Sequence, residues 1–421
     1  MRIEQTNCCR RLPLAMLIVL LVVVSAARAA MAASYEVAVY YWPNWHVDAR
    51  NEKWLGKGWT EWELVKTATP RFHGHFQPRV PLWGYQDESD PSVMAKKIDA
   101  AADNGITAFI FDWYYYNEGI ALDRCLHEGF LKASNRNRLK FSIMWANHDY
   151  EDIFPARIGK QRTHWNAGAI TRAAFVKATD LLIKEYFSQP NYWKIDGRPY
   201  FSIYQLNTLM RGLGGAEKTR QALEDFRARC KVAGLPGVHI NAVASGVQLD
   251  GIGSKPVQDS SGKGKPPVVI KDAVGLLTAI GIDSVTSYVW VDHFIPPSFP
   301  TFPYEKMGDA AVAHWPEFQK KFKVPYYPNV SVGWDSTPRT DLSQEFKNAG
   351  YPHIAVAVDG TPAGFKKYLE KAKAYLAVRP EGQRIVTINS WNEWTEGSYL
   401  EPDTKTKMEY LDAVKAVFPP Q

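Results

Sequence analysis

The chain has 421 residues, of which 46% are hydrophobic and 22% are charged. This balance excludes an intrinsically disordered chain and supplies enough apolar side chains for one large domain or two ordinary ones. The formal net charge is +6, but the basic residues form no concentrated stripe of the kind that nucleic-acid-binding proteins carry. We therefore expect no nucleic-acid partner.

The first 33 residues differ in character from the rest. Arg10 and Arg11 precede the apolar run LAMLIVLLVVV (residues 14–24), and small residues follow it. This order is typical of a secretory signal peptide, and the run is shorter than the about 20 apolar residues of a membrane span. We expect residues 1–33 to be removed, leaving a secreted or periplasmic monomer with no stable membrane insertion. An uncleaved N-terminal anchor is the alternative.

Two cysteines, Cys125 and Cys230, follow this segment. Export permits a disulfide bond between them. Two cysteines in a large domain are more often independent buried thiols, so we favour free thiols.

Short apolar runs recur along the chain, and helix-like stretches separate them. Continuous rather than alternating apolarity is typical of parallel strands covered on both faces. Strands are predicted at residues 37–42, 107–115, 140–149, 198–204, 238–245, 284–290, 327–335 and 384–391. Helices are predicted at residues 90–105, 173–187, 218–234 and 363–378, the first of them with an aspartate cap and a proline in its first turn.

Eight strands that alternate with helices favour an α/β fold, a (β/α)8 TIM barrel in a single domain with elaborated βα loops. A doubly wound α/β sheet is the alternative, but no strand–GxGxxG–helix unit is present. The long segment 43–91, rich in proline and tryptophan, is predicted to be a loop after the first strand on the catalytic face. The segment KPVQDSSGKGKPP (255–267) is predicted to be a solvated loop.

Tryptophan stands beside a polar or acidic residue at six of the eight predicted strand ends, where TIM barrels carry their catalytic residues. Indole faces stack on sugar rings while carboxylates and amides bind hydroxyls, so the pattern indicates a carbohydrate site. The alternative is that these indoles only complete the core. The candidate substrate-binding residues at the strand ends are Trp42, Asn44, Asp112, Trp113, Trp145, Asn147, Trp290, Trp334, Asp335, Trp391, Asn392 and Trp394.

The stretch NSWNEWTEGSYLEP (389–402) ends the last predicted strand and contains the candidate catalytic pair, Glu393 and Glu396. Residues three apart in an extended strand face opposite sides, so the pair can cooperate only if the chain turns sharply there, with Gly397 free to adopt positive φ. Glycoside hydrolases usually place one protonated and one ionised carboxyl group beside the glycosidic bond that they cleave. A surface acid pair is the alternative. For Glu401 we expect a structural role.

Other chemistries have little support. The chain contains no HExxH, P-loop or GxSxG motif. His46, His73 and His75 could bind a metal, but no Cys/His cluster accompanies them, and loop histidines that bind substrate or backbone fit better. The loop after the first strand adds four candidate substrate-binding residues, His46, Trp59, Glu61 and His75.

Several long motifs are familiar: WLGKGWTEWELVKTATPRFHGHFQPRVP (54–81), DPSVMAKKIDAAADNGITAFIFDWYYY (90–116), IMWANHD (143–149), GWDSTPR (333–339) and WNEWTEGSYLEPD (391–403). They resemble the WbsX-type proteins, the glycoside hydrolase family 99-like group related to the endo-α-mannosidases. The resemblance covers nearly the whole mature chain and implies that residues 34–421 form a catalytic barrel of that family.

The resemblance also implies a mechanism. Glu393 and Glu396 match the two acids of the family's similar NEW-x-EG motif, which act with retention through a 1,2-anhydro sugar. The first acid is the base on the 2-hydroxyl, and the second protonates the leaving group and then deprotonates water. This chemistry suits 1,2-trans glycosides such as α-mannosides or α-L-rhamnosides, and it implies an oligo- or polysaccharide substrate and no metal or organic cofactor.

Two departures qualify the resemblance. Relatives usually carry Gln-Phe-His after the first strand's proline, where this chain has PNWH (43–46). Members of the WbsX group are also often described as glycosyltransferases of surface-polysaccharide synthesis. A glycosyltransferase is therefore one alternative function, although an export signal would separate it from cytoplasmic nucleotide-sugar donors. A catalytically inactive glycan-binding barrel is the other.

Overall fold

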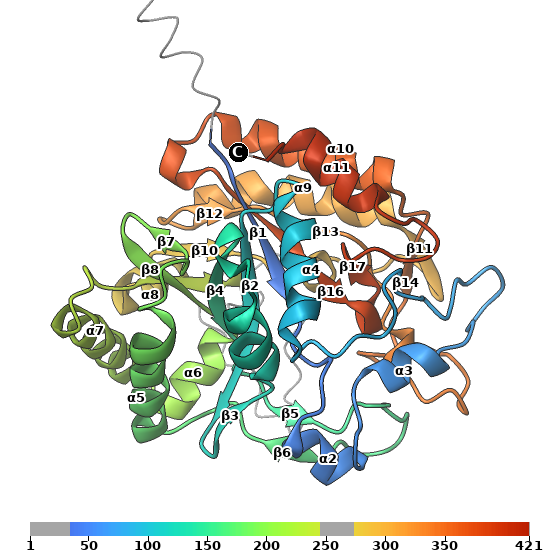
Figure 1. The fold of residues 1–421 in the computed structure, drawn as a ribbon, viewed down its shortest axis with the longest axis horizontal. Coiled ribbons are helices and arrows are strands. Elements are labelled where there is room, and N and C mark those ends of the chain that lie inside the picture. The colour runs from blue at the N-terminus through green and yellow to red at the C-terminus, as the bar shows by residue number, and fades with distance from the viewer. Residues whose placement is uncertain (1–33, 245–272, 421) are drawn as a thin grey trace, which may run out of the picture. The chain divides into compact units, whose positions relative to one another are not determined.

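Parallel strands close into a barrel (Figure 1). Along the sheet the order is β1 (Glu36–Tyr41), β2 (Ala108–Tyr116), β4 (Lys140–Trp145), β8 (Arg198–Ile203), β9 (His239–Val243), β10 (Ser284–Thr286) and β12 (Tyr326–Tyr327). Pro328 alone separates β12 from β13 (Asn329–Ser331), and β13 pairs with β15 (Ile385–Asn389), which pairs with β1. Because β12 and β13 together act as one strand, the barrel has eight strands, and the predicted TIM barrel is confirmed.

The computed structural model describes residues 34–244 and 273–420. The segment Tyr35–Gln421 forms one compact unit. The expected signal peptide and the loop predicted at 255–267 lie outside the described residues. In the described part of the chain, no helix is both long enough and apolar enough to cross a membrane.

All eight predicted strands are present, but several end earlier than expected. The strand predicted at 140–149 ends at Trp145, and the one predicted at 284–290 ends at Thr286 and is followed by a 3-10 turn at Trp290–His293. At these ends, side-chain hydrogen bonds take the place of the backbone hydrogen bonds between neighbouring strands. Asn147, for example, donates to the Gln205 carbonyl (2.8 Å) and accepts from the Gln205 N–H (2.7 Å).

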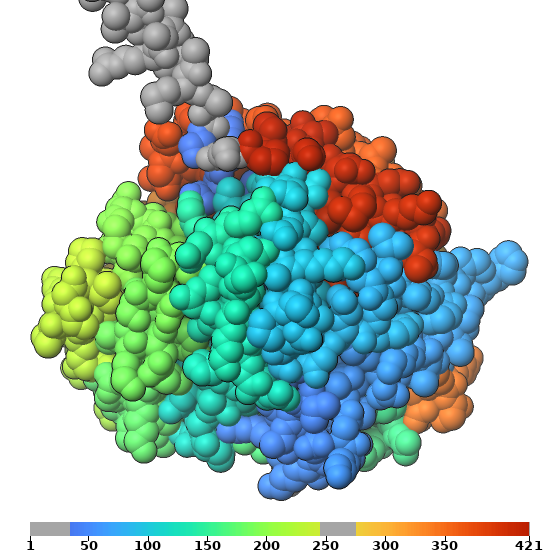
Figure 2. Space-filling model, viewed as in Figure 1, coloured from blue at the N-terminus to red at the C-terminus, as the bar shows by residue number. Residues whose placement is uncertain are grey.

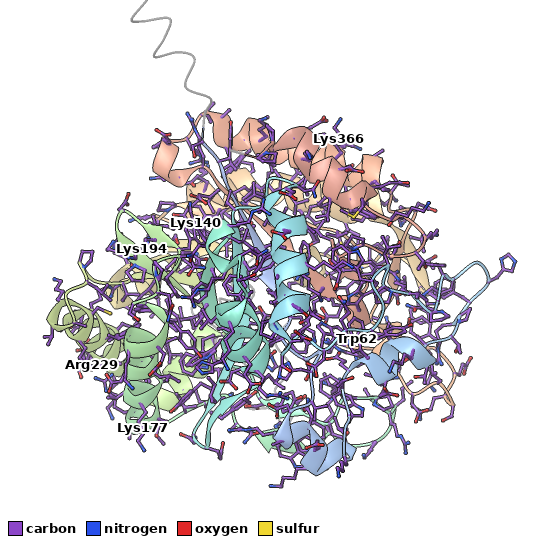
Figure 3. All side chains as sticks on the ribbon, viewed as in Figure 1. Trp62, Lys140, Lys177, Lys194, Arg229 and Lys366 are labelled. Atoms are coloured by element: carbon purple, nitrogen blue, oxygen red, sulfur yellow. The ribbon has the colours of Figure 1, made fainter. Side chains whose placement is uncertain are left out.

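Helices cover the outside of the barrel (Figure 1). The predicted ones are α4 (Pro91–Ala102), α5 (Arg172–Leu181), α7 (Ala216–Val232) and α10 (Pro362–Ala377), and the others on the barrel are α6 (Leu206–Leu213), α8 (Ala273–Ile280), α9 (Tyr304–Lys321) and α11 (Glu409–Val417). Asp90 caps α4 through the Ser92 N–H, with proline in the first turn as predicted. Lys177 on α5 and Arg229 on α7 lie at the periphery of the molecule (Figure 3).

Short helices and strands lie within the loops. They are α2 (Ala49–Leu55), α3 (Trp62–Thr67), β3 (Gly119–Ala121), β5 (Tyr150–Glu151), β6 (His164–Asn166), β7 (Lys194–Ile195), β11 (Thr301–Pro303), β14 (Val356–Val358), β16 (Asn392–Glu393) and β17 (Ser398–Tyr399). The predicted loop after β1 carries α2 and α3, and its Pro81 bridges to Asp403. This loop, in blue, lies beside the C-terminal red residues in Figure 2.

Two apolar clusters build the interior. The main cluster lies within the barrel and between its strands and helices, and both cysteines are buried free thiols in it, as favoured above. The second cluster joins the loop after β1 to the ends of the strands, and Trp62 of α3, labelled in Figure 3, belongs to it with Trp45, Tyr150 and Trp394. The loop is therefore a packed part of the domain.

Candidate active site

The sharp turn expected at Gly397 is present. After β15 the chain forms a hairpin from β16 and β17, joined by a 3-10 turn at Trp394–Glu396 and by Gly397 with φ of 62°. A Cβ atom on Gly397 would lie 2.6 Å from the Cβ of Asp335, so glycine is required there by conformation and by space. The turn brings Glu393 and Glu396 to the same site.

One guanidinium group contacts both acids. Arg339 places Nη2 3.3 Å from Glu393 Oε2 and Nη1 2.5 Å from Glu396 Oε1. Its Nη2 also lies 2.8 Å from Oε1 of Glu61, a third buried carboxylate that comes from the loop after β1. Arg339 itself is only 3% exposed. The three acids therefore form a buried cluster around a single cation, which we call the acid cluster.

Burial and mutual repulsion hold protons in this cluster. Burial first, and then the charge of Glu396, raise the pKa of Glu393 well above its ordinary value. Burial also raises the pKa of Glu396, but Arg339 and the hydrogen bond from Tyr351 act in the opposite direction. Two interacting carboxyl groups titrate as a pair, so these shifts favour keeping one proton on the pair.

Two tyrosines complete the site. Tyr351 donates to Glu396 Oε1 at 2.7 Å. The hydroxyl of Tyr288 lies 2.8 Å from Asp112 Oδ2 and 3.3 Å from Glu393 Oε1. Burial raises the pKa of Asp112, which ends β2 inside the barrel. A fourth carboxyl group thus reaches the acid cluster through a hydroxyl.

Several predicted substrate-binding residues lie at this cluster. The Trp42 indole N–H and the Asn44 amide both donate to Glu61 Oε2 at 2.8 Å, and the Arg339 guanidinium lies 5.1 Å from the Trp42 ring centre. The Trp334 ring lies 6.3 Å from the Tyr351 ring. The structure therefore brings Trp42, Asn44, Glu61, Asp112 and Trp334 together with the two acids.

Other predicted residues hold the frame of the site. Asp335 lies 2.9 Å from His75 Nε2 and accepts from Gln77 (2.8 Å) and Arg79 (3.1 Å). Burial would raise its pKa, but the contacts with His75 and Arg79 keep the pKa below the ordinary value. Asn392 accepts from the Trp42 N–H and donates to the Trp42 carbonyl, each at 2.8 Å, so it fixes the end of β1 to the hairpin. Asn147 joins the loops after β4 and β8 in the same manner.

Five predicted sugar-stacking tryptophans instead belong to the apolar interior. Trp113 stacks on Tyr115, Trp145 packs on Phe175 of α5, Trp290 on Tyr368 of α10, Trp391 on Phe109, and Trp394 on Tyr399. Side chains of a strand alternate between its two faces, and Trp113 follows the inward-facing Asp112, so its indole points away from the barrel interior. The alternative reading, that these indoles complete the core, holds for all five.

His46 and Trp59 also lie apart from the two acids. His46 is fully buried, and burial lowers its pKa to about 4, while the charges of Asp48 and Arg124 act on it in opposite directions. Trp59 meets the edge of Phe154 at 5.8 Å, and Phe154 in turn lies 5.7 Å from the Arg339 guanidinium. Trp59 is therefore one ring removed from the acid cluster.

The comparisons with known proteins agree with this architecture. The family model described as "Glycosyltransferase WbsX" matches residues 37–414. The chain belongs to the WbsX family. Uncharacterized protein WxcX of Xanthomonas campestris pv. campestris is 27% identical over 390 residues, which is 90% of this chain and 49% of that protein. This WbsX-family chain thus spans about half the length of the curated relatives it matches.

Solved structures with the same fold include glycoside hydrolases. A GH99 endo-alpha-mannosidase from Bacteroides thetaiotaomicron superposes with a TM-score of 0.54 at 13% identity, covering 92% of this chain and 97% of that structure. A structure described as a glycoside hydrolase-like protein gives 0.54 at 14% identity, covering 92% and 94%. At these identities the likeness establishes the fold of the WbsX-family chain.

Three residues that contact the two acids were missed by sequence reasoning: Arg339, Tyr288 and Tyr351. Arg339 ends the GWDSTPR motif, and its position after the seventh strand was a signal that could have selected it. Tyr288 lies within a predicted strand, and Tyr351 lies in an unpredicted segment. Neither tyrosine carried a sequence signal of its own.

Glu401 has the structural place expected for it. Its Oε1 lies 2.7 Å from Lys97 Nζ, and its Oε2 accepts from the Trp394 indole at 3.0 Å. Lys97 also pairs with Glu88, which contacts Asn392, and all of these groups are buried. The two carboxylates raise the pKa of Lys97 against the effect of burial. This ion network ties α4 to the hairpin beneath the acids.

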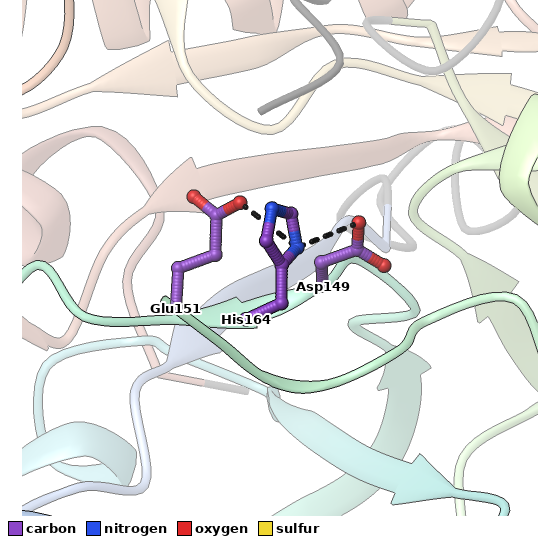
Figure 4. Close-up of side chains that lie close together, drawn as sticks. All are labelled: Asp149, Glu151 and His164. Carbon is purple, nitrogen blue, oxygen red and sulfur yellow. Dashed lines mark ion pairs between the residues drawn. The ribbon is translucent and has the colours of Figure 1, made fainter. Parts of the chain in front are cut away.

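Within the described residues, one group has the donor atoms and spacing for a metal ion: Asp149, Glu151 and His164, whose donor atoms lie within 4.8 Å of one another (Figure 4). His164 Nδ1 lies 3.5 Å from each carboxylate, and Arg162 lies 3.2 Å from the other oxygen of Glu151. These contacts make the group an ion-paired link between β5 and β6. It includes none of the histidines considered in the sequence analysis.

Proposed function

We propose that the protein is a retaining glycoside hydrolase that cleaves a 1,2-trans glycosidic bond of an oligo- or polysaccharide. The observation that carries this proposal is the pair Glu393 and Glu396, buried together around Arg339 at the C-terminal end of the barrel. A buried pair that shares a proton can present one acid and one base to the same bond. The charged, small-residue-flanked apolar segment at residues 14–24 supports action outside the cytoplasm.

The proposed steps follow the mechanism that the family resemblance implies. Glu393 accepts the proton of the sugar 2-hydroxyl while O2 forms a bond to C1. Glu396 gives its proton to the glycosidic oxygen, whose bond to C1 breaks, leaving a 1,2-anhydro sugar. Glu396 then takes a proton from water as the water oxygen bonds to C1, and O2 regains a proton from Glu393. Two inversions at C1 give net retention.

The contacts of the two acids add a second candidate assignment. Arg339 and Tyr351 both stabilise the charged form of Glu396, with contacts of 2.5 Å and 2.7 Å to its Oε1, whereas Arg339 lies 3.3 Å from Glu393 Oε2. The resting proton therefore favours Glu393, the reverse of the roles above. Either a sugar that enters the site shifts the proton to Glu396, or Glu393 is the acid.

One experiment tests the function and separates the roles. The protein is screened against bacterial, plant and algal polysaccharides, and the anomer released first is followed by NMR. Glu393→Gln and Glu396→Gln are then compared on the natural substrate and on the glycosyl fluoride of the same sugar. Fluoride leaves without a proton, so the variant that lacks the acid still releases fluoride in its first turnover, even though its second step lacks the base that activates water.

We expect both variants to lose at least about 100-fold in turnover on the natural substrate, since general acid–base catalysis contributes about that much or more. We expect Glu396→Gln alone to release fluoride in a first-turnover burst. Survival of the fluoride reaction only in Glu393→Gln would reverse the two roles. Full activity of both variants on the natural substrate would exclude the proposal.

Two other functions make different predictions. The family model's description favours a glycosyltransferase, which would transfer sugar from a nucleotide-sugar donor to an acceptor glycan. A binding barrel without catalysis would retain glycans from the same panel and release no products. Donor turnover by the purified protein would support the first, and binding without hydrolysis across the panel would support the second.

A further inference from the structure

A cavity of about 190 Å³ lies next to the acid cluster. Residues 156–160 and Arg162, from the loop after β4, form one wall, and Ala349, Tyr351 and His353 form the other. Tyr351 belongs to both places, because it lines the cavity and its hydroxyl donates to Glu396 Oε1 at 2.7 Å. A sugar positioned at Glu396 would therefore lie one aromatic side chain away from this cavity.

The lining of the cavity is basic. Arg157, Lys160 and Arg162 all line it, and none of the lining residues is acidic. Each cation has a carboxylate partner outside the lining: Arg157 Nε lies 2.8 Å from Asp341, Lys160 Nζ lies 2.7 Å from Asp152, and Arg162 Nη1 lies 3.2 Å from Glu151. Asp341 engages one nitrogen of Arg157, whereas Arg162 uses Nη1 for Glu151 and Nη2 for the Tyr351 carbonyl. The Arg157 and Lys160 side chains remain more than half exposed.

His353 adds a buried polar group without a partner. The residue is 4% exposed and its Nε2 has no hydrogen-bond partner, although it lines a polar cavity. Burial lowers the pKa of His353, the charges of Arg71 and Arg162 lower it further, and the charge of Asp341 acts in the opposite direction. A buried polar atom that lacks a partner costs free energy unless a ligand or water satisfies it.

We propose that this cavity is a subsite for an anionic substituent of the glycan, a carboxylate, sulfate or phosphate group carried by the sugar beside the cleaved bond. Arginine and lysine recognise such groups through charge-assisted hydrogen bonds, and His353 Nε2 supplies a further polar contact. The natural substrate is then an acidic polysaccharide. This inference rests on the proposed function, because the acid cluster defines where the sugar chain lies.

Binding tests the subsite independently of hydrolysis. Dissociation constants are measured for the Glu396→Gln protein with polygalacturonate, a sulfated galactan, a phosphomannan and neutral mannan, in about 0.15 M salt. The triple variant Arg157→Gln/Lys160→Gln/Glu396→Gln removes two cations and leaves the contact of Arg162 with the Tyr351 carbonyl in place. The matched control is Lys177→Gln/Lys194→Gln/Glu396→Gln, which loses the same charge at exposed positions elsewhere (Figure 3).

We expect at least one anionic glycan to bind more tightly than mannan. Loss of the two cations should weaken its binding by about tenfold or more, the effect of losing one charge-assisted hydrogen bond. The control should bind as Glu396→Gln does. The three anionic arms then identify the substituent.

Two results overturn the subsite. One is that no anionic glycan binds more tightly than mannan, and the other is that the cavity variant and the control weaken binding equally. A preference for acidic glycans that depends on Arg157 and Lys160, in a wild-type protein that hydrolyses no polysaccharide of the bacterial, plant and algal panel, would instead count against the proposed hydrolase function and leave the subsite standing.

Discussion

Replacement of Arg339 by methionine should destabilise the protein in a strongly pH-dependent way. Methionine keeps much of the apolar volume but leaves Glu61, Glu393 and Glu396 without their shared cation. Removing one partner of a buried ion pair costs about 3–5 kcal/mol, because a charge stays buried and unpaired. At pH 7 we expect the variant to lose stability of that order.

The loss should shrink in acid. Burial already raises the pKa values of Glu393 and Glu396, and removing Arg339 raises them further. A carboxyl group whose pKa is higher in the folded state contributes stability that is complete below its unfolded value of about 4.3 and is lost as pH rises through its folded value. The destabilisation should therefore be small at pH 4 and grow towards pH 7.

Urea unfolding at pH 4.0, 5.5 and 7.0 measures this directly. With an m-value of about 3 kcal/mol/M, the expected loss lowers the midpoint at pH 7 by about 1–1.7 M. Arg220→Met is the control, since Arg220 pairs with Glu217 and Glu224 on the exposed face of α7 and its loss should leave the midpoint unchanged at every pH. A shift for Arg339→Met that is equal at pH 4 and pH 7, or absent at pH 7, would refute the reasoning.

Two further predictions concern the hairpin. Gly397→Ala should lower the free energy of unfolding by about 1–3 kcal/mol, since alanine at φ of 62° is strained and its Cβ would lie 2.6 Å from Asp335 Cβ. Gly84→Ala is the control, because Gly84 has positive φ but open space around it. Equal urea midpoints for the two variants would contradict the close contact. Lys97→Met should lower the free energy of unfolding at pH 7 by about 3–5 kcal/mol, because it leaves Glu88 and Glu401 unpaired. Urea unfolding measures this loss, and Lys96→Met, at an exposed position, is the control. A midpoint like that of the control would show that Glu88 and Glu401 do not need the lysine.

The fold was largely predictable because local signals agreed with one another. Continuous apolar strands, an Asp-Pro start for α4 and the regular spacing of strands and helices all pointed to the same barrel. Strand ends were less accurate, as at Thr286, where the predicted strand continues into a 3-10 turn. Side-chain contacts from other loops decide such ends, and they have no signature in the local sequence.

The candidate site was predicted in part. The turn at Gly397 follows from the spacing of Glu393 and Glu396, so that prediction rested on backbone geometry. Arg339 contacts Glu61 and Glu396, which lie 278 and 57 positions away in the sequence, and no local sequence pattern indicates such a contact. Tryptophans such as Trp145 were misplaced because a strand end, unlike a strand interior, gives little indication of which face a side chain takes.

The hairpin that carries the two acids is held at every side by parts of the barrel frame. Asn392 fixes its base to β1, Glu401 fixes its end to α4 through Lys97, and Gly397 presses its tip against Asp335. The basic cavity, in contrast, belongs to loops that make none of these contacts. Tyr351 joins the two regions, so relatives that keep this tyrosine could exchange the rest of the loops at 146–166 and 341–353, acquire new glycans, and keep the same reaction.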